Sequence, residues 1–381
     1  MREASCKLCE WAYSIDCMER EKDEPCENFM PMNDRVYKFG SLFSGIGAPE
    51  KALDNLGVCY ELQYFSEIDP PAVRSYCAIH QTDESMNLGD ITKIDAAGLP
   101  KDLDFITYGF PCQDISLEGK KIGLFNEDGS RTRSGLFFDA ARIIEETRPK
   151  VAIAENVKNL TSKMLRPQFE IVLKTLEDAG YNNYWSVLDA RNHGIPQRRE
   201  RVFIVSIRKD IDTGRFRFPE GYPLEVDLED MLENLVDKTE LDYIFSKDLI
   251  DKMITFVGQV ARVKQATQKG YIEALPGDSI NLEQPNSKTR HGRVGKKVAQ
   301  TLTTSPQQGV YVPRKDWSRI IRRFTPRECW RLMGFQDTDF DKAAELNSSS
   351  QLYKQSGNSI VVPVLEDIFK AIFDAGVFDE Y

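Results

Sequence analysis

Cys112 is the side chain of this sequence best suited to act as a nucleophile. It lies in the hexapeptide Gly-Phe-Pro-Cys-Gln-Asp at residues 109–114, directly after the apolar run at residues 103–108. Such a run predicts a buried strand, so the cysteine would stand where the strand emerges into a cleft. Because Pro111 restricts the backbone, a thiolate held there could attack an electron-poor ring carbon.

Glu155 is a candidate general acid, because it follows the apolar residues 151–154 and a carboxylate buried at the mouth of a sheet gains proton affinity. The alternative is a loop carboxylate held by the following backbone amides. Arg199 and Arg201 precede the apolar run at residues 202–207 and would point the same way if strand geometry begins there. One guanidinium could bind a carbonyl oxygen and the other a carboxylate or phosphate, with surface salt bridges as the alternative.

A glycine-containing turn and two carboxylates suggest a second binding site. The turn at residues 43–47, Phe-Ser-Gly-Ile-Gly, would let backbone amides approach a ligand, although an ordinary turn is the alternative and the third glycine of a dinucleotide fingerprint is missing. Glu67 ends the next strand, where an acidic side chain can accept both hydroxyls of a ribose. Asp90 would lie near a third strand end and could bind an adenine amino group. Each carboxylate could instead cap a helix.

The elements that must position these residues alternate between apolar strand-like runs and helical periodicity. This alternation predicts a doubly wound α/β domain with a parallel sheet. The expected strands are residues 36–43, 62–67, 105–108, 151–155, 184–188 and 201–207. Amphipathic helices are expected at residues 134–148 and 169–179, the second ending at Gly180.

Composition is that of a soluble globular protein with one or two domains: 381 residues, 41% of them hydrophobic and 29% charged. We expect a cytoplasmic protein without a membrane segment, because no long apolar run and no secretory signal pattern is present. The formal net charge of −10 argues against a uniformly basic nucleic-acid binder. Charge is unevenly distributed, however, and basic residues outnumber acidic ones between Gly258 and Arg327.

Three regions follow from this pattern. Residues 35–208 and 346–381 are expected to form the catalytic and cofactor-binding domain, and residues 209–345, where the alternation ends, a smaller second domain. Residues 1–34 form a Cys-rich extension. The candidate DNA-binding residues are the basic side chains of the second domain, Lys288, Arg290, Arg293, Lys296 and Lys297; a solvated loop is the alternative.

The order of the motifs resembles that of the bacterial-type DNA (cytosine-5)-methyltransferases, from Phe39 to about Phe373. The similar segments are the cofactor turn at residues 43–47, the Gly-x-Pro-Cys-Gln motif at 109–113 with a later serine at Ser116, Glu-Asn-Val at 155–157, Gln-x-Arg-x-Arg at 197–201, Arg-x-x-Thr-Pro-Arg-Glu at 322–328, and Gly-Asn-Ser-x-x-x-x-Val at 357–364. Single motifs of this size occur by chance, but six in a fixed order are highly specific.

This resemblance implies a fold and a chemistry. The fold would be that of S-adenosylmethionine-dependent methyltransferases, with the second domain recognising the target. Cys112 would add to carbon 6 of cytosine, Glu155 would protonate or hydrogen-bond ring nitrogen 3, and Arg199 would hold the exocyclic oxygen. Arg201, Gln113 and Ser116 complete the expected catalytic set. The residues expected to hold S-adenosylmethionine are Phe43, Gly45, Ile46, Gly47, Glu67, Ile68, Asp90, Ile91, Phe110, Asn358 and Ser359.

The expected substrate is a cytosine flipped out of a specific, short palindromic site in double-stranded DNA. The enzyme would be monomeric and belong to a restriction-modification system, sharing its site with an endonuclease, or be a phage or orphan methylase. Two alternatives are an RNA (tRNA) cytosine-5 methyltransferase and a catalytically silent DNA-binding regulator. The first is disfavoured because Phe110 replaces the second proline usual in tRNA-modifying relatives. The second is disfavoured because Cys112, Glu155 and Arg199 are intact.

The extension contains the cysteines Cys6, Cys9, Cys17 and Cys26. Cytoplasmic redox conditions disfavour disulfides, so a structural zinc site is the sharper hypothesis. Only one of the two pairs has the close spacing of a zinc ribbon, and the resemblance does not extend to this segment.

Overall fold

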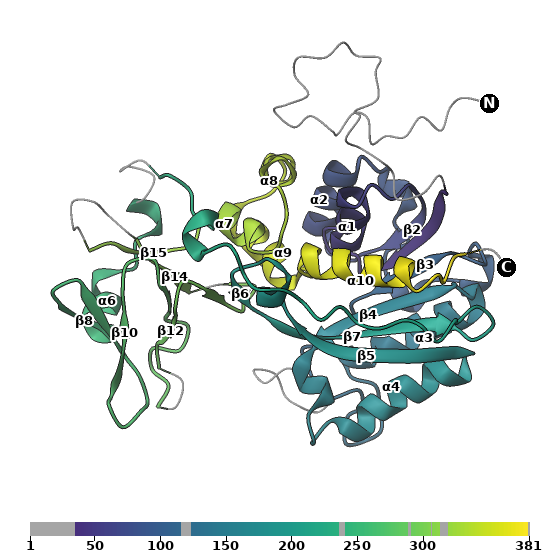
Figure 1. Ribbon diagram of the computed structural model, residues 1–381, viewed down its shortest axis with the longest axis horizontal. Coiled ribbons are helices and arrows are strands. Elements are labelled where there is room, and N and C mark those ends of the chain that lie inside the picture. The colour runs from purple at the N-terminus through teal and green to yellow at the C-terminus, as the bar shows by residue number, and fades with distance from the viewer. Residues whose placement is uncertain are drawn as a thin grey trace, which may run out of the picture.

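The computed structural model describes residues 35–115, 123–235, 241–288, 291–305, 307–312 and 319–379, which form a large lobe and a smaller one (Figure 1). The large lobe contains β1 (Tyr37–Leu42), α1 (Ala48–Asn55), β2 (Tyr60–Ser66), α2 (Pro70–His80), β3 (Phe105–Tyr108), α3 (Phe137–Thr147), β4 (Val151–Val157), α4 (Arg166–Asp178), β5 (Tyr181–Asp189), β6 (Gln197–Arg198), β7 (Glu200–Arg208), α7 (Pro326–Arg331), α8 (Asp337–Ala344), α9 (Ser349–Asn358) and α10 (Val362–Asp374). The six expected strands and both expected helices are confirmed.

The central sheet has the order β2-β1-β3-β4-β7-β5. The pairs from β2 to β4 are parallel, which confirms a mostly parallel sheet. β7, however, runs antiparallel to both of its neighbours. The sequence did not indicate this reversal, because β7 is buried on both faces and reads as a continuous apolar run, like a parallel strand. The connection from β5 to β7 is too short for the helical crossover that a parallel neighbour needs.

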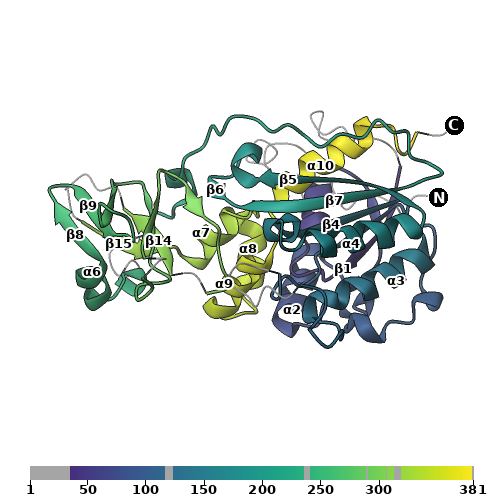
Figure 2. The same ribbon diagram turned by 90° about the horizontal axis from the view of Figure 1, so that it is seen from below.

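Helices cover both faces of this sheet, which confirms the doubly wound class. Successive strand residues enter different cores: Val151 and Ile153 of β4 face one side, Ala152 and Ala154 the other. α1 and α10 pack on the first face, and α3 and α4 on the second. Figure 2 shows α10 on the side of the sheet opposite α3 and α4. The carboxyl ends of β1 to β4 therefore meet at one edge, where parallel α/β sheets bind their ligands.

The smaller lobe has its own apolar core, built from residues between Phe245 and Ile321. It comprises α6 (Lys247–Met253), a three-stranded sheet in the order β10-β9-β8 and a four-stranded sheet in the order β12-β11-β14-β15. Their strands are β8 (Ile254–Val257), β9 (Val260–Lys264), β10 (Tyr271–Ala274), β11 (Ser279–Asn281), β12 (Arg293–Gly295), β14 (Gln308–Tyr311) and β15 (Ile321–Arg323). β13 (Ala299–Gln300) pairs with β6 and joins the lobes.

The ends of the expected second domain, residues 209–345, pack with the large lobe. Phe216 and Leu228 lie in the core on the α1 and α10 face, as do Trp330 of α7 and Phe340 of α8. The core of the smaller lobe is built from residues between Phe245 and Ile321, a narrower range than the expected domain. The loss of strand and helix alternation after residue 208 does not show which of the two cores a segment joins.

Among the described residues, no helix is both long and apolar enough to cross a membrane.

Candidate active site

The turn after β1 has an unusual backbone that opens it toward a ligand. Phe43, Gly45 and Gly47 have φ angles of 52°, 57° and 79°, all in the left-handed region. This region is costly for a phenylalanine but accessible to glycine. A side chain at Gly45 would meet no atom within 4 Å, so the space above the turn is open. The turn leads into α1, where Pro49 lies in the first helical turn.

Glu67 and Asp90 both already accept backbone hydrogen bonds. Glu67 accepts from the N–H of Gly45 at 2.9 Å and from those of Ile68 and Asp69 at 2.8 Å each. Burial raises the pKa of Glu67, and these N–H groups oppose that rise. The exposed Asp90 caps a short 3-10 helix through the N–H of Thr92 at 3.0 Å, and bonds with Thr92 lower its pKa. Asp90 therefore caps a short helix, which was the alternative to a ligand-binding role for this carboxylate.

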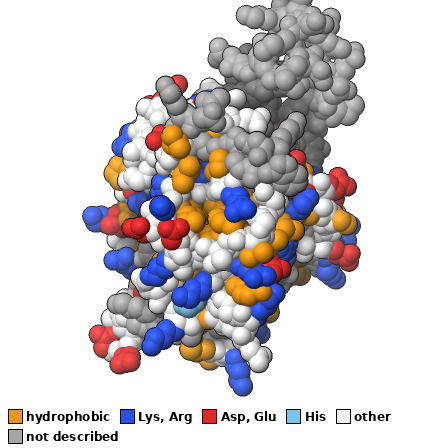
Figure 3. Space-filling model, turned by 90° about the vertical axis from the view of Figure 1, so that its left-hand side faces the viewer, with side chains coloured by type: hydrophobic (Ala, Val, Ile, Leu, Met, Phe, Trp, Pro, Cys, Tyr) orange, Lys and Arg blue, Asp and Glu red, His pale blue; other side chains and the backbone are white. Residues whose placement is uncertain are grey.

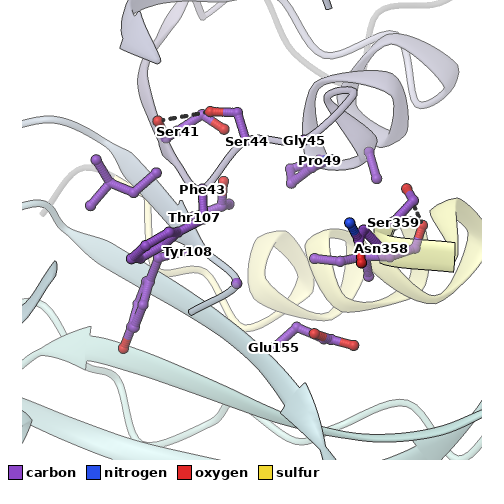
Figure 4. A pocket seen from close by; sticks show the side chains of 14 residues that line it. Ser41, Phe43, Ser44, Gly45, Pro49, Thr107, Tyr108, Glu155, Asn358 and Ser359 are labelled. Atoms are coloured by element: carbon purple, nitrogen blue, oxygen red, sulfur yellow. Dashed lines mark hydrogen bonds between the residues drawn. The ribbon is translucent and has the colours of Figure 1, made fainter. Parts of the chain in front are cut away.

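A pocket with about 440 Å³ of space lies between the turn, the end of β3 and the end of α9. Figure 4 shows Phe43, Gly45 and Pro49 around it, with Asn358 and Ser359 from α9. Glu155 also lines this pocket. Of the other expected cofactor residues, Ile46, Ile91 and Phe110 are buried, whereas the Ile68 side chain is 72% exposed.

Two asparagines fix the segment that carries Cys112. Asn156, at the end of β4, donates from Nδ2 to the carbonyl oxygen of Phe110 at 3.0 Å. Asn159 donates from Nδ2 to the carbonyl oxygen of Ile115 at 2.6 Å. These bonds bracket Cys112 and tie it to the strand that carries Glu155. Neither asparagine was an expected site residue, although Asn156 stands in the Glu-Asn-Val triplet.

Cys112, Glu155 and Arg201 form one electrostatic group. Arg201 Nε lies 3.0 Å from Glu155 Oε1, and both side chains are largely buried. Burial raises the pKa of Glu155 despite the nearby guanidinium groups. Burial and the Glu155 carboxylate also raise the pKa of the half-buried Cys112, while Arg201 and Arg199 oppose that rise. The resting nucleophile is therefore a thiol at neutral pH, beside a carboxyl group whose pKa burial raises.

Arg199 is placed differently from Arg201. Its guanidinium donates to the carbonyl oxygens of Leu302, Gly357 and Ser359 at 3.2, 3.1 and 2.7 Å. Burial lowers the pKa of Arg199 to about 9, so it remains a cation at neutral pH. Through these bonds Arg199 links the end of β6 to the segment after β13 and to the end of α9. Its guanidinium is thus occupied by main-chain carbonyls, whereas the sequence suggested that it holds the substrate oxygen.

The remaining expected residues lie outside this cluster. Gln113 is exposed and accepts from Arg133 at 2.7 Å. Lys296 and Lys297 pair with Asp278 and Asp227 at 2.8 and 2.6 Å. Lys288 and Arg293 are exposed, and Arg293 lies 3.8 Å from Glu283.

Several expected residues fall outside the part of the chain that the structure describes, namely Ser116, Arg290, Cys6, Cys9, Cys17 and Cys26. Within the described part, no group of three or more His, Cys, Asp or Glu side chains could hold a metal ion.

The fold and this ligand edge define the class: a doubly wound α/β protein with a ligand site at the carboxyl ends of its parallel strands. Among solved structures, the chain is similar to the Dnmt2 methyltransferase of S. pombe, with a TM-score of 0.56 and 18% identity over 89% of this chain and 99% of that one. It is also similar to the Entamoeba histolytica methyltransferase EhMeth, with a TM-score of 0.59 and 18% identity over 89% and 98% of the two chains. At this identity these neighbours establish the fold alone.

The chain belongs to the C-5 cytosine-specific DNA methylase family, whose model matches residues 37–374. It is 36% identical to the type II methyltransferase M2.ScrFI of Lactococcus lactis subsp. cremoris, over 87% of this chain and 97% of that protein. It is 31% identical to the orphan methyltransferase M.SPBetaI of Bacillus phage SPbeta, over 89% and 98%. The type II methyltransferase M.HhaI of Haemophilus parahaemolyticus is 32% identical over 87% and 92%. The chain is therefore a DNA (cytosine-5)-methyltransferase, which favours this function over the RNA-modifying and silent alternatives.

Proposed function

We propose that Cys112, Glu155 and Arg201 carry the methylation of cytosine carbon 5 in duplex DNA. The observation that supports this most is their shared location: Glu155 and Arg201 are paired at 3.0 Å, and both act on the pKa of Cys112. A thiol beside an easily protonated carboxyl suits addition to carbon 6 of the ring, since electrons can then move toward nitrogen 3.

The pocket beside this group fits the adenosyl group and the amino-acid end of S-adenosylmethionine. It is a concave site that reaches from the glycine turn to Glu155, and both backbone and polar side chains line it. Gly45 leaves space above the turn, and the Glu67 carboxylate is held at the end of β2. Asn358 and Ser359 would close the opposite wall. When bound, S-adenosylmethionine supplies an electrophilic methyl group.

The protein residues would act in order on the cytosine ring. Cys112 passes its proton to water as its sulfur bonds to carbon 6, and protonated Glu155 donates its proton to nitrogen 3. Carbon 5 then carries enamine character and accepts the methyl group as its bond to the sulfonium sulfur breaks, while nitrogen 3 returns its proton to Glu155. Loss of the carbon 5 proton to water reforms the double bond and breaks the carbon 6–sulfur bond, and the released Cys112 thiolate regains a proton.

We assign the contact with the exocyclic oxygen to Arg201 in place of Arg199. Arg199 already donates to three main-chain carbonyls, and removing it from them would leave buried acceptors without donors. Arg201 lies beside the proposed acid and can stabilise negative charge that develops on the ring oxygen.

The smaller lobe is the proposed target-recognition unit, with its core between Phe245 and Ile321. Figure 3 shows Lys and Arg side chains spread around apolar ones on its far face, without a single basic block. Because Lys296 and Lys297 are paired with carboxylates, any phosphate contacts they make would compete with these ion pairs. The target cytosine would be flipped from a short palindromic site.

Three further proposals concern assembly and the N-terminal extension. The enzyme would act as a monomer, either with an endonuclease of the same specificity or as an orphan methylase. The four N-terminal cysteines would bind one structural zinc ion, a proposal that rests on their spacing alone. Metal analysis after mild purification should find about one zinc per chain, and less than about 0.2 would exclude the site.

The proposed reaction is tested by incubating the purified protein with unmethylated duplex DNA and labelled S-adenosylmethionine. The account predicts label in 5-methylcytosine after digestion to nucleosides, and bisulfite sequencing would then give the target site. Label in N4-methylcytosine, or transfer to tRNA in preference to duplex DNA, would contradict it.

A further inference from the structure

A cluster of buried titratable groups lies directly behind the cofactor turn and has no part in the chemistry proposed above. Glu50 of α1 is fully buried and accepts from the Tyr76 hydroxyl of α2 at 2.7 Å. His80, the last residue of α2, has a side chain only 3% exposed, and its ring lies 4.8 Å from that of Tyr76. Burying such polar groups costs free energy unless they form hydrogen bonds or ion pairs.

His80 contacts the backbone of the turn itself. Its Nε2 lies 3.1 Å from the carbonyl oxygen of Ile46. A Cβ atom placed on Gly47 would lie 2.1 Å from the same Nε2, so the imidazole occupies the space that any other residue would need. The carbonyl and the glycine both belong to the stretch with left-handed φ angles at Gly45 and Gly47. His80 therefore packs directly against the backbone of the turn, in the space that Gly47 leaves.

The other ring nitrogen faces a carboxylate. His80 Nδ1 lies 3.7 Å from Asp54 Oδ2, at the far end of α1. A neutral imidazole carries one proton and can donate on one side only, whereas an imidazolium donates to Ile46 and faces Asp54 favourably at the same time. The only arrangement that suits both neighbours is the cation.

The surrounding groups decide how readily His80 is protonated. Glu50 and Asp54 face it from α1 and Tyr76 from its own helix, while Tyr60 of β2 lies close to both carboxylates. Burial alone would lower the pKa of His80, but the nearby carboxylates of Asp54 and Glu50 outweigh burial and raise the pKa. The pKa of Glu50 is raised by burial.

We propose that His80 is a positioning residue for the cofactor turn, and that its imidazolium ties the Ile46 carbonyl to Asp54 and so strengthens the binding of S-adenosylmethionine. This inference rests on the proposed cofactor site. The stabilisation is present while His80 is a cation, and it is lost as the pH rises through the pKa of His80 in the folded protein.

The test measures the Kd for S-adenosylmethionine by isothermal titration calorimetry from pH 6 to pH 9, in the full chain and in His80→Gln. At pH 6.5 the variant should bind about tenfold more weakly, the effect of losing one charge-assisted hydrogen bond. The ratio of the two Kd values should shrink as the pH rises. Taking a ratio removes the titration of the ligand's own amino group, which both proteins share.

His193→Gln is the matched control, because His193 is equally buried and its Nδ1 lies 2.7 Å from Asp367, away from the turn. Its Kd profile should follow that of the unaltered protein even if its stability falls. If His80→Gln binds as tightly as the unaltered protein at every pH, or if His193→Gln reproduces its defect, the inference is wrong.

Asp54→Asn provides a second variant that does not touch the turn and alters a side chain that is 34% exposed. Losing this carboxylate lowers the pKa of His80, so the affinity should decline at a lower pH than in the unaltered protein. An unchanged profile would overturn the inference while leaving the cofactor site intact. If the unaltered protein binds no S-adenosylmethionine at any pH, the proposed function itself fails.

Discussion

At the scale of single residues, reactivity depends on a thiol that its surroundings keep protonated. Burial and Glu155 raise the pKa of Cys112 above its ordinary value of 9.0, and the two arginines oppose this rise. In the resting protein Cys112 is therefore a thiol, which is a weak nucleophile. When the sulfur bonds to carbon 6 of a bound cytosine, its negative charge moves into the ring, where Glu155 and Arg201 can stabilise it.

The pH dependence follows from this environment. Between pH 7 and pH 9 the alkylation rate of Cys112 by iodoacetamide should rise about tenfold per pH unit, because the thiolate is the nucleophile and its pKa lies above this range. Arg201→Gln removes a cation that lowers this pKa, so alkylation should be slower at each pH. Peptide mapping resolves Cys112 from the other cysteines. A rate that levels off below pH 8 would contradict the raised pKa.

The two arginines should fail in different ways. Arg201→Ala should lower the rate of methyl transfer about 100-fold, as expected for a lost donor to developing charge, with a smaller loss of stability because Glu155, left without its partner, can take up a proton. Arg199→Ala should instead lower the free energy of unfolding by about 3 kcal/mol or more, because three buried carbonyl oxygens lose their donor. Stopped-time methylation assays and urea denaturation measure the two effects. The reverse pattern would return the substrate contact to Arg199.

The sequence pattern singled out Cys112 and Glu155 as candidates but could not separate these arginines. Positions 199 and 201 are two residues apart, so period-two geometry places both on one side. β6 ends at Arg198 and β7 begins at Glu200, which leaves Arg199 between the strands and in contact with residues more than 100 positions away. No local pattern contains that information.

At the scale of elements, β4 and the segment after it organise the site. The strand ends in Glu155 and Asn156, and the following turn supplies Asn159. One element thus carries the proposed acid and holds the segment of the nucleophile at the carbonyls of Phe110 and Ile115. These two bonds hold the segments together, and Phe110 and Ile115 also pack in the core of the lobe.

Removing one of these bonds should affect turnover more than binding. Asn159→Ala should lower kcat about tenfold with an unchanged Kd for S-adenosylmethionine, because it loosens the segment after Cys112 without touching the pocket. Asn183→Ala is a suitable control, since Asn183 makes a comparable 2.9 Å bond to the Leu173 carbonyl far from the site. Equal loss of kcat in both variants would indicate a general effect on folding.

The six strands of the central sheet and the helices α3 and α4 were predictable because each is a strongly apolar or periodic run. The direction of β7 was not, since a strand buried on both faces carries no signal of its orientation. The role of Asp90 was equally ambiguous. An aspartate that follows a strand can cap a helix or bind a ligand, and the residue type is the same in both cases.

At the scale of the whole molecule, a buried ion pair joins the smaller lobe to the large one. Arg322 of β15 donates to both carboxylate oxygens of Glu328 in α7, at 2.8 and 2.7 Å, and the two side chains are 1% and 0% exposed. Glu328 also accepts from the N–H groups of Glu233 and Thr325, at 2.9 Å each. The late Arg-x-x-Thr-Pro-Arg-Glu motif is thus a structural junction.

Breaking this pair on one side should be more damaging than replacing it entirely. Glu328→Gln should lower the free energy of unfolding by about 3–5 kcal/mol, because the Arg322 charge remains buried without its partner. The double variant Arg322→Met with Glu328→Leu should recover part of that loss. Guanidinium denaturation with a probe in each lobe measures this; additive losses in the double variant would contradict the coupling.

The central claim is that one thiol bonds to the target base during methyl transfer. The most direct test incubates the protein with S-adenosylmethionine and duplex DNA whose target cytosine carries fluorine at carbon 5, where the missing proton prevents release. We predict a covalent complex that survives denaturation and maps by mass spectrometry to Cys112, and its absence in Cys112→Ser, which should still bind DNA but transfer no methyl groups. Substantial turnover by Cys112→Ser, or an adduct at another residue, would contradict the account.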